Sequence, residues 1–254
     1  MAKALTLWLR CNHLRADGAH SPRAGNVLSP SSWIANLVAA AARTLTGATA
    51  HWINCAPEAC QRVYFANHTS NLDFVVLWSV LPRHIRARTR PVAAKDYWQS
   101  GLRRRLAINV FNAILVERSG TGKAERSGAL GKATDDDNDK AEQISAARHS
   151  LELMLEALAA NQSLIIFPEG TRGKGGPVGP FKSGLYYLWL KRPDVQFVPV
   201  YLANLNRVLP KGEVLPVPFI SRIAFGPPLQ PVAQQSKESF LKEAREALCA
   251  LQRA

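Results

Sequence analysis

The sequence predicts an α/β layered domain, in which strands and helices alternate along the chain. Short apolar runs rich in β-branched and aromatic residues indicate strands at residues 62–66, 163–167 and 195–203, and at the later run 221–226. Apolar residues recur at helical spacing over 143–160, and again after Ser236, a favourable N-cap for a C-terminal helix. We find no internal repeat.

A length of 254 residues suits one main domain with terminal additions. We expect an N-terminal connector and helical segment over 1–56, a main domain over 57–232 and a C-terminal helix over 233–254. Residues 119–142 are polar and of low complexity, so we expect a mobile insertion there. Its acidic D-x-D-x-D run, which starts at Asp135, lacks the glycine and final glutamate of a calcium loop, and no metal site is predicted.

The net charge of +13 and the pI near 10.0 predict an anionic partner, either nucleic acid, lipid headgroups or a phosphorylated substrate. No RNA- or DNA-binding module is recognisable, and the arginines alternate with aliphatic residues more than with stacking aromatics. The four cysteines lack the spacing of a zinc site or a disulfide framework, so we expect reduced thiols in a cytosolic setting. The apolar run at residues 4–9 is too short for a signal-peptide core.

Two segments have the pattern of membrane-surface helices. Residues 33–52, after Ser31 and Ser32 as candidate N-caps, are mostly apolar but are interrupted by Arg43. We interpret them as an amphipathic helix that lies in the membrane interface or packs on the core. Residues 83–105 are densely basic, and the overlapping stretch 97–118 carries an apolar stripe at helical spacing, which indicates either an anionic membrane contact or a solvated helix.

The first candidate for chemistry is the stretch NHTSNLD, which follows the predicted strand at 62–66. Ser70 and Asp73 have the spacing of a capping box, which predicts a helix start. This interpretation leaves His68 unexplained. An imidazole beside a carboxylate in the first turn of a helix has the components of a general base and of the group that orients it.

Two further stretches carry candidate ligands for an anion. FPEGTRG ends a predicted strand and presents Glu169, Gly170, Thr171 and Arg172 in a row, with Lys182 near the same edge. Glycine permits a close backbone approach, and arginine offers a planar fork for phosphate. The run ILVER delivers Arg118 to a glycine-containing loop as a second candidate.

Together these blocks resemble the glycerolphosphate acyltransferases of phospholipid synthesis, in particular the bacterial 1-acylglycerol-3-phosphate acyltransferases. NHTSNLD is similar to the H-x4-D block of that family, ILVER to its second block, FPEGTR to its third, and FVPVYL around Pro199 to its fourth. The blocks occur in the order of the family, and the resemblance spans roughly residues 60–230.

The resemblance implies a mixed central sheet flanked by helices. It also implies that His68, oriented by Asp73, deprotonates the free hydroxyl of a lysophospholipid, which attacks an acyl-CoA or acyl carrier protein thioester without a further cofactor. Arg118 and Arg172 would hold the phosphate of the acceptor. Glu169 with Gly170 would fix its glycerol end, and Pro199 would shape the acyl side. Thr171 and Lys182 are further candidates for substrate binding.

Alternatives remain open at this stage. The acceptor is most simply lysophosphatidic acid, but a lyso-ornithine lipid, another lysophospholipid or glycerol 3-phosphate would suit the same motifs. A non-catalytic basic membrane-binding protein is a further alternative. For the enzyme we expect a peripheral or monotopic position on the cytoplasmic side of the cell membrane.

Overall fold

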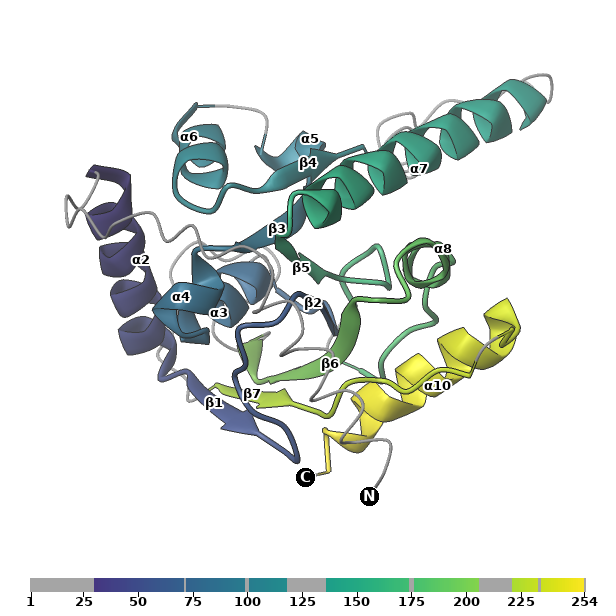
Figure 1. The fold of residues 1–254 in the computed structure, drawn as a ribbon. Helices are drawn as coiled ribbons and strands as arrows, with labels where there is room; N and C mark the ends of the chain where they lie inside the picture. The colour runs from purple at the N-terminus through teal and green to yellow at the C-terminus, as the bar shows by residue number, and fades with distance from the viewer. Residues whose placement is uncertain are drawn as a thin grey trace, which may run out of the picture.

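The computed structural model describes residues 30–70, 72–98, 101–117, 136–173, 176–205, 221–232 and 234–253. These residues form a seven-stranded sheet of order β1-β7-β6-β2-β5-β3-β4 (Figure 1). The strands are β1 (Thr49–Trp52), β2 (Arg62–Ala66), β3 (Thr89–Ala94), β4 (Ile114–Val116), β5 (Ser163–Ile166), β6 (Gln196–Ala203) and β7 (Arg222–Phe225).

The sheet is mixed, as predicted. Strands β6, β2, β5, β3 and β4 run parallel to their neighbours. Strand β7 pairs antiparallel with β6, and β1 pairs parallel with β7. The carboxyl ends of the five parallel strands therefore meet at one edge of the sheet, which is where ligands bind in open α/β folds.

Helices cover both faces of the sheet (Figure 1). The first face carries α2 (Pro30–Thr46), α3 (Asp73–Val80) and the short α4 (Arg83–Arg86), and the second carries α7 (Asp136–Ala159), α8 (Gly184–Lys191) and α10 (Lys237–Ala250). The short α5 (Lys95–Trp98) and α6 (Gly101–Asn109) lie between β3 and β4 in the chain.

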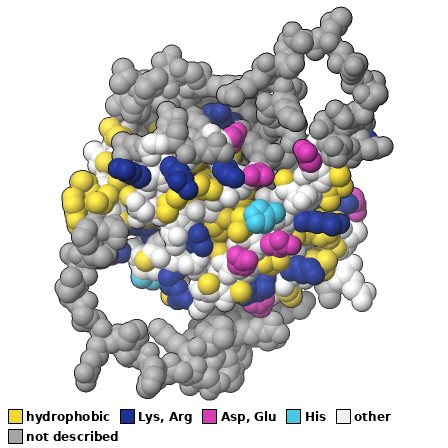
Figure 2. Space-filling view, turned by 90° about the horizontal axis from the view of Figure 1, so that it is seen from above, with side chains coloured by type: hydrophobic (Ala, Val, Ile, Leu, Met, Phe, Trp, Pro, Cys, Tyr) yellow, Lys and Arg dark blue, Asp and Glu magenta, His cyan; other side chains and the backbone are white. Residues whose placement is uncertain are grey.

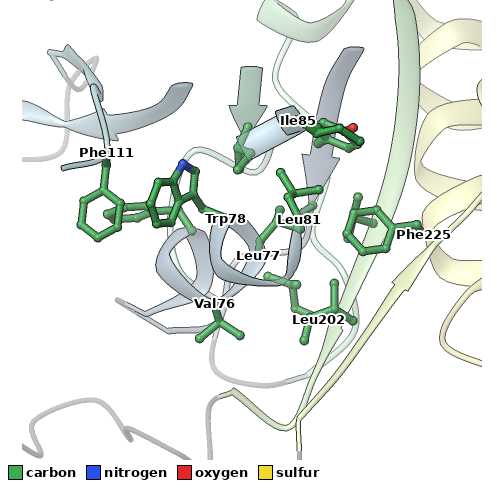
Figure 3. Close-up of a cluster of buried hydrophobic side chains, with 14 of the residues drawn as sticks. Val76, Leu77, Trp78, Leu81, Ile85, Phe111, Leu202 and Phe225 are labelled. Atoms are coloured by element: carbon green, nitrogen blue, oxygen red, sulfur yellow. The ribbon is translucent and has the colours of Figure 1, made fainter. Parts of the chain in front are cut away.

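Alternation along the strands divides the core into two clusters. Tyr64 of β2 faces the α3 side, whereas its neighbours Val63 and Phe65 face α8 and α10. All five residues of β2 are buried, as expected for a central parallel strand covered on both faces. Figure 3 shows the first cluster, in which Leu77 and Trp78 of α3 lie among Phe111, Leu202 and Phe225.

The strands predicted at 62–66, 163–167, 195–203 and 221–226 are confirmed to within one residue at either end. The helix after Ser236 is also confirmed, because the Ser236 side chain accepts a hydrogen bond from the backbone N–H of Ser239 at 3.2 Å. Strand β3 and helix α8 were not predicted. Pro91 and Arg90 obscure the strand pattern of β3, which lies between β5 and β4.

The helix predicted over 33–52 is wrong in its last part. Helix α2 ends at Thr46, Gly47 follows with a φ of +53°, and residues 49–52 form β1 instead. The left-handed conformation at glycine ends the helix, and the next residues gain backbone hydrogen bonds to β7. The predicted boundary between 1–56 and 57–232 therefore separates a strand from its own sheet.

The interpretation of helix α2 as packed on the core is confirmed, and its position at a membrane stays a prediction. One side packs against α3 and buries Ala39, while Trp33, Leu37 and Leu45 on the other side are about half exposed, at 53%, 60% and 51%. Among the described helices, none is both long enough and apolar enough to cross a bilayer.

Within the stretch 97–118, where helical spacing was predicted, α6 covers Gly101–Asn109 and the run ILV forms β4. The segment 83–118 as a whole is not one helix. The segment is divided into α4, β3, α5, α6 and β4, and Arg86 is buried rather than exposed to a surface. Its guanidinium donates to the backbone oxygen of Ser79 at 3.2 Å and to Oδ1 of Asn36 at 2.6 Å, and lies 5.0 Å from the centre of the Trp78 ring. Arg86 thus joins α2 to α3.

The predicted insertion at 119–142 is only partly described. Residues 119–135 of this stretch, Asp135 included, lie outside the described part of the chain. Residues 136–142 form the first turns of α7. The helix therefore begins at 136 rather than at 143. Acidic residues at the start of a helix interact favourably with its dipole, and this stretch begins with Asp136 and Asp137.

Candidate active site

The loops after β2 and β5 meet at the carboxyl edge of the sheet. These strands are direct neighbours, so residues 67–70 and 167–173 are brought together although about a hundred positions separate them. The backbone N–H of Gly173 donates to the His68 oxygen at 2.8 Å, which joins the two loops directly.

His68 and Asp73 are in contact, as the sequence pattern predicted. Nδ1 of His68 lies 2.8 Å from Oδ2 of Asp73, and the Asp73 side chain is fully buried. An ionised carboxylate can only accept hydrogen bonds, so Nδ1 carries the proton and Nε2 keeps a free lone pair. This arrangement makes Nε2 the basic atom of the ring.

Asp73 also organises the start of α3. Its Oδ2 accepts from the backbone N–H groups of Thr69 at 2.6 Å and Ser70 at 2.8 Å. Half of the predicted capping box is therefore present, because the acidic side chain reaches back to the N–H of Ser70. The other half is absent, because the Ser70 hydroxyl accepts from Leu72 at 3.3 Å and α3 begins only at Asp73.

The imidazole is fixed from a second side by an aromatic contact. The ring of Phe167, directly after β5, stacks on His68 with centroids 4.5 Å apart and an interplanar angle of 26°. The His68 side chain stays 18% exposed, while its carboxylate partner is fully covered. The imidazole is thus held in place but remains accessible.

His68 lines a cavity of about 300 Å³ at this edge. The cavity walls come from the loops after β2 and β5, from the end of β6 with Tyr201, and from Gln252 after α10. Burial raises the pKa of the Tyr201 hydroxyl above its ordinary value. The end of the C-terminal helix contributes to this wall, which the sequence did not indicate.

Glu169 is engaged by the main chain through both carboxylate oxygens. Oε1 accepts from the backbone N–H of His68 at 2.8 Å, and Oε2 accepts from that of Gly179 at 2.9 Å. Glu169 also lines the cavity beside His68. Its carboxylate therefore connects the loop that carries His68 to the loop that follows FPEGTRG.

Gly170 and Lys182 lie against each other. Gly170 has a φ of +71°, and a Cβ atom at this position would lie only 2.6 Å from Cε of Lys182. The backbone N–H of Lys182 donates to the Pro168 oxygen at 2.8 Å, which fixes the approach. The left-handed backbone favours glycine here, whereas the exposed end of the Lys182 side chain can shift.

The remaining predicted site residues are placed differently. Thr171 is exposed and Arg172 half-buried, directly before the cavity-lining Gly173. Pro199 is buried inside β6, opposite Phe65, and is not part of the cavity wall. Arg118 lies outside the described residues.

A second hollow, of about 460 Å³, lies farther along the same edge, after β3 and β4. Lys95 and Glu117 form an ion pair of 2.9 Å there, and Arg104 and His149 complete the polar lining. The hydrogen bond from Lys95 lowers the pKa of the Glu117 carboxyl. Figure 2, seen from above Figure 1, shows Lys and Arg side chains interspersed with acidic ones and a histidine.

Sequence reasoning missed Asn67, which anchors the loop of His68 to β6. The Asn67 side chain is buried and pairs with the main chain of Leu202, accepting from its N–H at 2.7 Å and donating to its oxygen at 3.0 Å. The sequence signal for this role is weak: an asparagine stands between a predicted buried strand and His68. Phe167 was likewise assigned only to the strand.

Comparison with known proteins gives the family. The sequence model of the Acyltransferase family matches residues 51–203, which is more than half of the chain and includes both loops of the cavity. The chain belongs to the Acyltransferase family. Helix α10 and β7 lie beyond the matched residues.

Individual relatives are similar to parts of this acyltransferase-family chain. A 1-acyl-sn-glycerol-3-phosphate acyltransferase of Limnanthes douglasii is 33% identical over 66% of the chain and 50% of its own length. The 1-acyl-sn-glycerol-3-phosphate acyltransferase alpha of Homo sapiens is 27% identical over 62% of the chain and 46% of its own length. For these two relatives the matched part is thus at most half of their length.

The fold also matches a solved structure. The 1-acyl-sn-glycerophosphate acyltransferase of Thermotoga maritima superposes with a TM-score of 0.61 at 18% identity, over 87% of this chain and 78% of its own. At that identity the likeness concerns the fold: an α/β arrangement with helices on both faces of a mixed sheet.

Proposed function

We propose that this protein transfers a fatty acyl chain from acyl-CoA or acyl carrier protein to the free hydroxyl of 1-acyl-sn-glycerol 3-phosphate, giving phosphatidic acid. The observation that carries the proposal is the 2.8 Å contact between His68 and the buried Asp73 at the wall of a cavity. The family membership supports the reaction class, and the names of the relatives support the acceptor.

The proposed chemistry requires one base and no acyl-enzyme. Nε2 of His68 removes the proton from the acceptor hydroxyl as its oxygen attacks the thioester carbonyl. The tetrahedral intermediate then expels the thiolate, which takes the proton from the imidazolium, so that an ester and a free thiol result. Asp73 stabilises the imidazolium and keeps Nδ1 protonated. No cofactor besides the donor takes part.

Cations near the turn after β5 are proposed to hold the acceptor phosphate. Arg172 and Lys182 flank Gly170, and within the described chain no hydrogen bond or ion pair engages the Arg172 guanidinium. A planar guanidinium and a flexible ammonium suit a phosphate together. Arg118 is proposed as a further phosphate ligand, with Thr171, Glu169 and Gly170 beside the glycerol and Pro199 shaping the site from within β6.

The acceptor is a lipid, and the outer side of α2 offers a contact to its membrane. Trp33, Leu37 and Leu45 expose apolar surface on this helix, and the net charge of +13 favours anionic headgroups. We propose peripheral attachment to the cytoplasmic side of the cell membrane.

The base is tested by acyl transfer to lysophosphatidate with His68→Ala and, as a matched control, His84→Ala. His84 is exposed on α4, away from the cavity. We expect the His68 variant to lose at least about a hundredfold in kcat, the usual contribution of a general base, and the His84 variant to keep its activity. Equal activity in the two variants would refute the assignment of His68.

A further inference from the structure

Arg245 of α10 donates hydrogen bonds to the main chain of the loop that faces Glu169. Its Nη2 donates to the Val178 oxygen at 2.6 Å, and its Nε donates to the oxygens of Val178 and Gly179 at 3.0 and 3.1 Å. Helix α10 is anchored in the core through Phe240, Ala244 and Leu248, which are fully buried. A residue next to Ala244 is therefore delivered to the loop by a rigid element.

The peptide group between Val178 and Gly179 is held at both of its ends. Its oxygen accepts from Arg245, and its N–H donates to Oε2 of Glu169 at 2.9 Å. Hydrogen bonds at the two ends of one peptide polarise each other, because pulling on the oxygen makes the N–H a stronger donor. Arg245 therefore strengthens and aims the contact with Glu169.

The same carboxylate continues the chain of contacts to the base. Oε1 of Glu169 accepts from the backbone N–H of His68 at 2.8 Å, and the Cβ position of Gly179 lies 3.0 Å from Oε2. A side chain at 179 would thus push against the carboxylate. A continuous path of hydrogen bonds leads from Arg245 through a peptide and a carboxylate to the main chain of His68.

We propose that Arg245 is a positioning residue for the reaction, which holds His68 in place through Gly179 and Glu169. The inference rests on the proposed function for its kinetic consequence. Arg245 itself lies beyond the residues matched to the family, whereas the residues it reaches, Gly179, Glu169 and His68, lie within them. Arg245 does not itself line the cavity, although Val178 and Glu169 on its path do. Its side chain therefore acts on the site only through the residues it holds.

The kinetic test compares Arg245→Met, which keeps an apolar stem, with Lys242→Met at an exposed position of the same helix. We expect kcat of the Arg245 variant to fall about tenfold or more, since small displacements of a catalytic group are costly, with KM changed by less than about twofold. Added guanidinium should restore part of the rate. Wild-type kcat in the Arg245 variant would overturn the proposal.

A double-mutant cycle with Glu169→Gln distinguishes positioning from general stability. Glutamine cannot accept through its amide nitrogen, so it interrupts the path at one of its two contacts. In that background Arg245→Met should lower kcat by less than about twofold, because the path is already broken. If the two losses multiply, Arg245 acts by another route and the inference is wrong.

Amide hydrogen exchange tests the path without any substrate. The amides of His68 and Gly179 should exchange at least about tenfold faster in Arg245→Met than in wild type or Lys242→Met. Unchanged exchange at both amides would overturn the inference. If wild type transferred no acyl chain but exchange rose as expected, the proposed function would fail while the positioning path would stand.

Discussion

Asp73 combines two tasks at the scale of single residues. One oxygen accepts from two backbone N–H groups at the start of α3 and also from Nδ1 of His68. The helix start therefore fixes the carboxylate, and the carboxylate fixes the ring. The same carboxylate oxygen thus serves the predicted capping pattern and the proposed catalytic pair.

For Asp73→Asn we expect kcat for acyl transfer to fall about a hundredfold or more, because the amide does not hold the imidazolium and does not enforce the tautomer. The control is Asp194→Asn, whose carboxylate pairs with Arg192 just before β6 and outside the cavity wall. Steady-state rates on lysophosphatidate give the comparison. A wild-type rate in Asp73→Asn would contradict the pairing.

Gly170 is the second residue whose replacement is informative. Alanine there meets both a left-handed backbone, with φ of +71°, and Cε of Lys182 at 2.6 Å. We expect Gly170→Ala to raise KM for lysophosphatidate several-fold and to cost about 1 kcal/mol or more of stability. Gly184→Ala, where nothing lies within 4 Å, serves as the control and should be neutral or stabilising. Equal KM values would contradict a role for the turn.

Residue types and spacing revealed His68, Asp73 and the turn at Gly170, because these contacts are local in sequence. Glu169 was predicted to contact the acceptor, but its two bonds to main-chain N–H groups were not foreseeable. They depend on how β2 and β5 pair and on where Gly179 returns to the site. Asn67 and Arg245 stayed hidden for the same reason.

At the scale of elements, the apolar strand β2 buries a polar group, the hydroxyl of Tyr64. Among the described residues this hydroxyl has no hydrogen-bond partner of good geometry, although the Arg62 guanidinium is close enough to interact with it. Burial raises the pKa of this hydroxyl to about 12, from an ordinary value of 10.0. The protonated phenol is thus favoured by the fold, and ionisation opposes folding.

This shift predicts how stability depends on alkaline pH. The folded-state pKa is above the unfolded one, so the contribution is complete below about pH 10 and is lost as pH rises towards about 12. Wild type should lose about 1.4 kcal/mol more than Tyr64→Phe between about pH 8 and about pH 11. Tyr187→Phe, at an exposed tyrosine, is the control. Parallel pH profiles of the free energy of unfolding would contradict the assignment.

Strands were predictable from the sequence where their own residues are apolar enough to indicate a buried strand. The buried strands β2, β5 and β6 have continuous apolar runs, whereas β3 contains Arg90 and Pro91 and is a strand only because β5 and β4 flank it. Likewise residues 49–52, predicted as the end of the N-terminal helix, form β1 because they pair with β7, about 170 residues later in the chain. Pairing between distant strands cannot be read from the local sequence pattern.

At the scale of the whole molecule, the apolar side of α2 predicts attachment to a membrane. For Leu37→Glu we expect binding to anionic vesicles to weaken at least about tenfold, since burying one leucine side chain contributes about 1.5–3 kcal/mol. Leu37 is 60% exposed, so the fold should tolerate the change. Vesicle sedimentation provides the measurement.

The matched control for membrane binding is Ala141→Glu, an equal change of charge at an exposed position of α7 on the other face of the sheet. Its binding should fall only slightly. If both variants weakened equally, attachment would depend on net charge alone, and the proposal for α2 would be wrong. High salt should weaken the vesicle binding of both variants, because it screens the charge of the headgroups.

The proposed reaction is acyl transfer to a lysophospholipid at the cavity beside His68. The most direct measurement supplies wild type and His68→Ala with a radiolabelled acyl thioester and a panel of acceptors: lysophosphatidate, a lyso-ornithine lipid, other lysophospholipids and glycerol 3-phosphate. We predict label in phosphatidic acid as the main product of wild type and its loss in the variant. Label in none of the acceptors, or equal label with both proteins, would contradict the account.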